Sequence, residues 1–142
     1  MNKIDPIKTW HKVVENGELS KLDEILDEDC IFYSPVVFSP QNGKEATKKY
    51  LSAAAIVFAD DSFNYTKELI TTGLACLEFE LALNEINING IDIISWNEDG
   101  KITEFKVMIR PLKAVEIIHK YMGKELKSVS YTHLTLPTIA LV

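Results

Sequence analysis

Asp92 is the residue of this chain with the clearest capacity for chemistry. It stands among Ile91, Ile93, Ile94 and Trp96, in a segment that has the pattern of a β-strand. A carboxylate in apolar surroundings costs free energy unless it is paired, protonated or open to a pocket. Two interpretations follow. Asp92 is a protonated acid in a pocket, or it accepts hydrogen bonds from a buried Tyr, Trp or backbone amide and does no chemistry.

Two strands joined by a tight turn are expected to position Asp92. The pattern predicts strands over about residues 86–97 and 101–110, and the second strand alternates apolar with polar residues. Asn97-Glu-Asp-Gly100 forms a hairpin loop with Gly at the left-handed position. If Asp92 points inward, Ile91 and Ile93 lie on the outer face of the sheet.

The rest of the chain predicts helices packed on a sheet. Helices are expected between the caps Asp5 and Gly17, over 19–26, over 44–58, and over 112–122 with a stop at Gly123. The other expected strands are 30–34, 63–72 and 74–84. Helices on one face of a strongly curved antiparallel sheet make an α+β fold. A sheet that bends around a helix leaves a conical cavity, and cavities of this kind hold small ligands.

Composition limits the classes of protein and partner. A chain of 142 residues is typical of one domain, with 46% hydrophobic and 25% charged residues. The net charge of −6 argues against nucleic acid or an anionic membrane as partner. No apolar run approaches the ~20 residues of a membrane span, and the first residues do not resemble a signal peptide. We therefore expect a cytoplasmic protein.

The cysteines and histidines do not suggest a metal site or a cofactor. Cys30 and Cys76 each lie in an expected strand, where free thiols behave as small apolar residues. His11, His119 and His133 are not clustered. The sequence therefore predicts no metal, no cofactor and no His–Asp pair.

The last fifteen residues differ from the rest of the chain. Residues 128–142 contain no Asp, Glu, Lys or Arg. The segment resembles translated sequencing-adapter read-through, which is excluded from fold reasoning. A native terminal strand or a tail that touches a membrane is the alternative. We expect one domain over 1–127 and a non-native, poorly ordered tail over 128–142.

The chain resembles the nuclear transport factor 2-like superfamily, in its SnoaL-like and ketosteroid-isomerase-like branch. The resemblance covers about residues 5–122 and rests on the order and spacing of four short motifs: Asn16-Gly-Glu-Leu19, Leu26-Asp-Glu-Asp29 with Phe32-Tyr-Ser-Pro35, Gly43-Lys-Glu-Ala46, and Ile91-Asp92 through Gly100-Lys-Ile102. It implies a cone-shaped (cystatin-like) α+β barrel with an apolar pocket. It also implies a homodimer through the outer face of the sheet.

Only one of three functional positions of ketosteroid isomerases is kept. The general-base Asp is expected directly before Pro35, where this chain has Ser34. The oxyanion Tyr is replaced by Trp10, and an indole N–H is a far weaker acid than a phenol. The oxyanion Asp corresponds to Asp92, nine residues before Lys101. Steroid-type isomerisation is therefore not expected.

Further residues are predicted to line the pocket around Asp92, although core packing explains most of the aromatic ones better than pocket lining does. Those residues are Trp10, Tyr33, Ser34, Tyr50, Phe58, Ile94, Trp96, Phe105 and Val107. The ligand is expected to be compact and apolar. If the protein is an enzyme, Asp92 would act as general acid or hydrogen-bond donor in an isomerisation, cyclisation or hydration. The alternative is a non-catalytic module for ligand binding or dimerisation.

Overall fold

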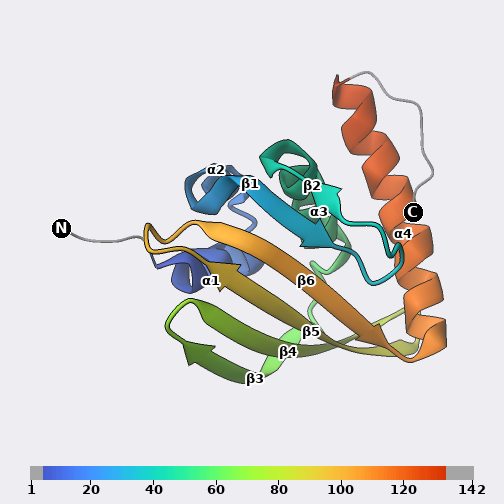
Figure 1. Cartoon of the computed structure of the whole chain (residues 1–142). Coiled ribbons are helices and arrows are strands. Elements are labelled where there is room, and N and C mark those ends of the chain that lie inside the picture. Colours follow the sequence, from blue (N-terminus) through green and yellow to red (C-terminus); the bar gives the residue numbers. More distant parts are fainter. Residues whose placement is uncertain (1–4, 134–142) are drawn as a thin grey trace.

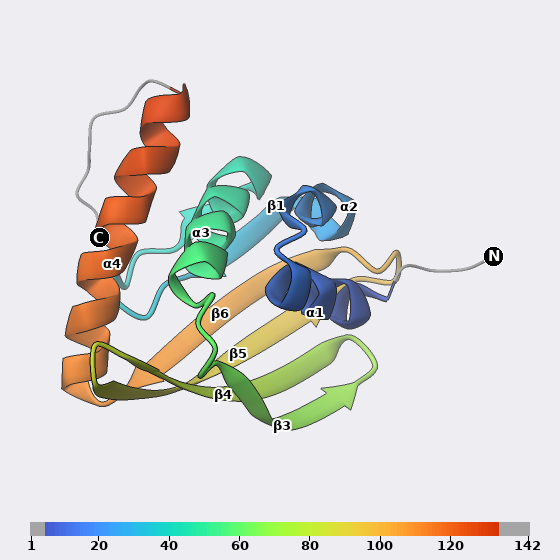
Figure 2. The same ribbon diagram turned by 180° about the vertical axis from the view of Figure 1, so that it is seen from behind.

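The computed structural model describes residues 5–133, which form one curved sheet with helices on one side of it (Figures 1 and 2). The sheet has the strand order β2-β1-β6-β5-β4-β3 and is not closed into a complete barrel. The strands are β1 (Leu26–Tyr33), β2 (Gln41–Asn42), β3 (Asn64–Thr71), β4 (Leu74–Leu83), β5 (Ile86–Trp96) and β6 (Ile102–Arg110). The helices are α1 (Pro6–Asn16), the short 3-10 helix η1 (Leu19–Lys21), α2 (Leu22–Ile25), α3 (Lys44–Val57) and α4 (Leu112–His133). The predicted α+β class with a curved sheet around helices is confirmed.

Helix α1 begins and ends at the residues that the sequence predicts. The Asp5 side chain accepts hydrogen bonds from the backbone N–H groups of Ile7 and Lys8, both at 3.1 Å. At the other end Gly17 adopts φ 68°, and its N–H bonds to the Val13 carbonyl. These two caps fix which face of α1, including Trp10, packs against the sheet.

The inner face of β5 is buried at every second residue, because side chains alternate across a strand. Asp92 is one of these inward residues and is only 6% exposed. Gly90 is another: a Cβ there would meet the ring of Phe79 and approach the Met108 carbonyl oxygen to 2.8 Å. Gly90 therefore lets Phe79 lie against the β5 backbone, one inward position away from Asp92.

The N-terminal half differs from expectation in two respects. The predicted helix over 19–26 is only η1 and α2, because Leu26 already enters β1 and pairs with Ile102 of β6. Strand β1 runs parallel to β6, so the sheet is mixed and not wholly antiparallel. Lys101 holds this junction, since its Nζ donates to the Glu24 carbonyl at 2.7 Å.

Helix α4 continues through Gly123, so the predicted stop at this residue is wrong. Met122 and Leu126, four residues apart, both bury against the core, and burial of this stripe outweighs the low helix propensity of one Gly. The helix includes residues 128–133 of the predicted tail, and residues 134–142 lie outside the described residues. The non-native origin of the tail stays a prediction.

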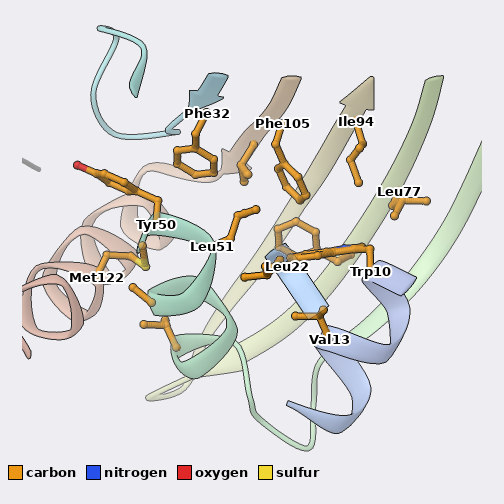
Figure 3. Packing of buried hydrophobic residues seen from close by; sticks show 14 of the residues in the cluster. Trp10, Val13, Leu22, Phe32, Tyr50, Leu51, Leu77, Ile94, Phe105 and Met122 are labelled. Atoms are coloured by element: carbon orange, nitrogen blue, oxygen red, sulfur yellow. The ribbon is translucent and has the colours of Figure 1, made fainter. Parts of the chain in front are cut away.

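Two contacts between aromatic side chains can be followed in Figure 3, and they adjoin each other, because the ring centroids of Phe32 and Phe105 lie 6.2 Å apart. At one, Trp10 meets Phe105 edge-on with ring centroids 4.8 Å apart. At the other, Phe32 stacks on Tyr50 at 5.3 Å, with Met122 nearby. No helix of residues 5–133 is long and apolar enough to cross a membrane.

We predict that Gly123→Ala stabilises the protein by about 0.5–1 kcal/mol. A Cβ at Gly123 would have no atom within 4 Å, and the residue lies inside a helix. Urea denaturation measures the change in the free energy of unfolding. The matched control is Gly90→Ala, which we expect to destabilise by roughly 1–3 kcal/mol through overpacking. Destabilisation by Gly123→Ala would show that the helix ends there.

Candidate functional site: a buried acid at an apolar cavity

Asp92 is the last member of a hydrogen-bond chain that joins three elements. The Tyr65 hydroxyl, from β3, donates to Asp92 Oδ2 at 2.6 Å. The Trp10 indole Nε1–H, from α1, donates to the Tyr65 oxygen at 2.9 Å. The chain therefore runs from a helix, through one strand, to the central strand β5.

Strand register brings Tyr65 to Asp92 although one strand separates them. Tyr65 is opposite Phe79 on β4, and Asp92 is opposite Leu77 on the other edge of β4. Both side chains point to the inner face, so the long phenol reaches diagonally across β4. Trp10 approaches from the buried face of α1 and is held edge-on by Phe105.

The chemistry of the three groups fixes the direction of this chain. An indole N–H only donates, so the Tyr65 oxygen accepts from Trp10 and its single proton goes to Asp92 Oδ2. If Oδ2 accepts this proton as the carbonyl oxygen of neutral Asp92, the acid proton is carried by Oδ1. None of residues 5–133 hydrogen-bonds to Oδ1. The Oδ1 atom is thus the one left for a ligand.

The surroundings shift the pKa values of both ionisable groups upward. Burial raises the pKa of Asp92 to about 7, and the hydrogen bond from Tyr65 partly opposes that rise. Burial, followed by the charge of Asp92, raises the pKa of Tyr65 well above its usual 10. Near neutral pH both forms of Asp92 are populated, while Tyr65 stays a neutral phenol and a hydrogen-bond donor.

Asp92 lies on the wall of a cavity of about 40 Å³ that is otherwise mainly apolar. Its other walls include four phenylalanines, Phe58, Phe63, Phe79 and Phe105. A cavity that holds benzene is larger, on the order of 150 Å³. The cavity as it stands therefore has room for water, and a larger ligand requires side chains to move.

A second cavity of about 30 Å³ adjoins the first. Three residues line both cavities: Ala54, Phe58 and Val107. The second cavity is also lined by Tyr50 of α3 and Met122 of α4. Its walls include Phe32, which stacks on Tyr50, whereas Asp92, Trp10 and Phe105 line the first cavity.

The sequence profile of the SnoaL-like domain family matches residues 7–105. The chain belongs to this family. A search of curated proteins gave no match.

Among solved structures, the chain is similar to a steroid delta-isomerase from Pseudomonas aeruginosa, with 30% identity and a TM-score of 0.81 over 91% of this chain and 96% of that one. It is also similar to an uncharacterised protein with a cystatin-like fold from Silicibacter pomeroyi, with 26% identity and a TM-score of 0.80 over 90% and 89% of the two chains. The epoxide hydrolase/cyclase-like enzyme SalBIII, which acts in pyran ring formation, shares the fold at 14% identity and a TM-score of 0.60, over 75% and 89%. These matches agree with the predicted superfamily.

Most residues predicted to line a pocket do line one of the two cavities of this SnoaL-like chain. The first cavity is lined by Trp10, Phe58, Asp92, Phe105 and Val107, and the second by Ser34, Tyr50, Phe58 and Val107. Ser34 is already engaged, because its Oγ accepts from the N–H groups of Val36 and Val37 at 3.0 and 3.3 Å. Its turn-forming role is therefore present whether or not a ligand binds.

Three of the predicted pocket residues line neither cavity. Tyr33 points to the outer face, where the Lys106 ammonium lies 5.0 Å from its ring centroid. Ile94 is fully buried opposite Phe105 and belongs to the packed core. Trp96 follows a register irregularity at the end of β5 and is only partly buried. Apolar character alone did not separate core residues from cavity walls.

Tyr65 is the residue of the candidate site that the sequence analysis missed. A buried Tyr or Trp was among the partners considered for Asp92, but Tyr65 itself was not identified. The available signal was its place as the aromatic residue at the start of β3, whose antiparallel pairing with β4 brings it to the inner face. Within residues 5–133 no cluster of three or more His, Cys, Asp or Glu is arranged for a metal ion.

The raised pKa of Asp92 predicts a pH dependence of stability. Its folded pKa is about 7, against roughly 3.9 in an unfolded chain, so the folded state binds more protons between these values. The free energy of unfolding should therefore fall as pH rises, by roughly 2–3 kcal/mol between pH 5 and pH 8. Urea denaturation at both pH values measures it.

Asp92→Asn is the control for this pH dependence, since it keeps the side-chain shape and an acceptor oxygen for Tyr65 but removes the titration. The free energy of unfolding of Asp92→Asn should therefore change between pH 5 and pH 8 by roughly 2–3 kcal/mol less than that of the wild type. If both proteins lose the same stability from pH 5 to pH 8, the acid is not titrating as described.

Proposed function

We propose that this protein binds a compact, mainly apolar molecule carrying one acceptor oxygen, and that Asp92 exchanges a proton with it in an acid/base isomerisation. Cyclisation or hydration would use the same proton transfer. The observation that carries the proposal is the free Oδ1 of a buried acid, with a pKa of about 7, on the wall of an apolar cavity. A catalytic acid or base works best when its pKa is near the working pH.

The hydrogen-bond chain supports a division of roles. Neutral Asp92 donates its Oδ1 proton to the ligand oxygen, and ionised Asp92 accepts a proton from the ligand. Tyr65 holds Oδ2 and so fixes which oxygen faces the cavity. Trp10 completes the chain by donating to the Tyr65 oxygen. The similarity to a steroid delta-isomerase supports the isomerase class.

The alternative is a non-catalytic binding module. Ser34 replaces the general base of the isomerases, and its Oγ is engaged by backbone N–H groups. Asp92 is then the single carboxylate among the described residues that line the first cavity. With one carboxylate, the site has no separate base to remove a proton while Asp92 donates to the ligand oxygen, which favours binding without turnover.

We predict that Asp92→Asn lowers the isomerisation rate at least about 100-fold, because a carboxamide does not transfer the proton. The probe is 3-cyclohexenone, whose conversion to the conjugated 2-cyclohexenone is followed by ultraviolet absorbance. Its affinity, from ligand-induced thermal shift, should change little. Glu104→Gln, which removes one exposed carboxylate from the outer face of the sheet, is the matched control and should keep the wild-type rate.

Two results would overturn the catalytic proposal. Equal rates in the wild type and Asp92→Asn would leave Asp92 without a role in proton transfer. Ligand stabilisation of the wild type without any turnover would favour the binding module.

A homodimer through the outer face of the sheet is part of the same proposal. Leu69 and Met108 are 71% and 50% exposed on that face, and the register places Ile91 next to Met108. Exposed apolar patches of this kind mark association surfaces. The free thiols Cys30 and Cys76 fit the proposed cytoplasmic location.

Sedimentation velocity tests the dimer. We predict that the wild type sediments as a dimer and that Met108→Glu sediments as a monomer with an unchanged fold by circular dichroism, because a charge on each copy repels the other across the two-fold axis. Lys113→Glu, a charge change outside the sheet, is the control and should leave the dimer intact. A wild type that is monomeric at high concentration would exclude this assembly.

A further inference from the structure

The two cavities have one aromatic side chain as a common wall. Phe58 lines both, together with the smaller Ala54 and Val107. The centroid of its ring lies 6.1 Å from that of Phe63 and 5.5 Å from that of Phe79, and both of these residues line the first cavity. Removing the Phe58 ring from this position would join the two spaces.

The backbone holds Phe58 in place while leaving its side chain partly free. Phe58 is the C-terminal cap of α3, and its N–H donates to the Ala54 carbonyl at 2.8 Å. Its side chain is only partly buried, unlike those of Phe79 and Phe105. A half-buried residue at a helix end changes rotamer at lower cost than a residue packed on all sides.

The two cavities differ in polarity. The first is lined by Asp92, whose Oδ1 has no hydrogen-bond partner among the described residues. The second is lined by apolar groups such as Val36, Ile118 and Met122, and its Ser34 hydroxyl is already engaged by two backbone N–H groups. A ligand that filled both would need a polar atom at one end only.

We propose that the two cavities are one binding site for an elongated amphiphile, with Phe58 as the residue that determines the length of ligand accepted. The acceptor oxygen of the ligand binds at Asp92, and its apolar chain passes Phe58 into the space between β1, α3 and α4. This rests on the proposed function, since it uses the same Asp92 as the polar anchor. Neither cavity alone, at about 40 and 30 Å³, holds more than a few atoms.

Methyl ketones of increasing length, from 2-butanone to 2-decanone, test the proposal by calorimetry. In the wild type we expect affinity to rise by about fourfold per added methylene, the gain for burying one CH₂ group, once the chain reaches past Phe58. Val36→Trp fills the second cavity from a loop. It should reduce the affinity for 2-decanone at least tenfold and change that for 2-butanone less than twofold.

Phe58→Leu is the complementary variant and should increase the affinity for long ketones over short ones. If folded Val36→Trp binds ketones of every length with the wild-type affinities, the ligand's alkyl chain does not enter the second cavity. The same conclusion follows if Val36→Trp weakens the binding of all ketones by an equal factor. Either result overturns the length proposal but leaves the anchor at Asp92 intact. Failure of every ketone to bind the wild type would instead overturn the proposed function and, with it, this inference.

Discussion

The site depends on the free-energy cost of burying one carboxyl group. Asp92 is almost fully buried on the inner face of the central strand, where its charged form is strongly disfavoured. The protein does not meet this cost with a cation, because the described hydrogen-bond partner of Asp92 is the neutral phenol of Tyr65. A neutral donor stabilises the charged form only in part, so the acid keeps a pKa of about 7 and not a value near 4. A buried Lys or Arg in place of Tyr65 would have lowered that pKa and fixed Asp92 as a permanent anion.

The elements were predictable where local chemistry decides them. The caps Asp5 and Gly17 set α1, and the alternation of β5 and β6 set which residues point inward, including Asp92. Prediction failed where tertiary contacts override local preference. Gly123 has low helix propensity, yet α4 continues past it because the helix buries Met122 and Leu126 on either side. Leu26 fits a helical stripe, yet parallel pairing with β6 draws it into β1.

The site was predictable to the same degree and for the same reason. Asp92 stood out because a carboxylate is rare in an apolar strand, which is a property of the sequence alone. Tyr65 did not, because its role depends on a diagonal contact across β4 that only strand register reveals. Trp10 was judged a weakened substitute for the tyrosine of the isomerases. In the structure, Trp10 donates a hydrogen bond to Tyr65, which lies on β3. The hydroxyl group that contacts Asp92 therefore comes from Tyr65, and not from the position of Trp10, where the isomerases have their tyrosine.

Tyr65 contacts Asp92, but it does not replace the tyrosine that the isomerases have at the position of Trp10. In a site with two independent donors, a phenol and an acid would both point at the ligand oxygen. Here the phenol is used to orient the acid, since Trp10 and Asp92 together occupy its oxygen and its proton. Under the proposed function, Oδ1 would be the one donor that Asp92 offers to a ligand, and the rest of the binding free energy would come from apolar contact. Phe58, Phe79 and Phe105 line the cavity and would provide that contact, so the shape of the cavity, more than its polar groups, would decide which ligand binds.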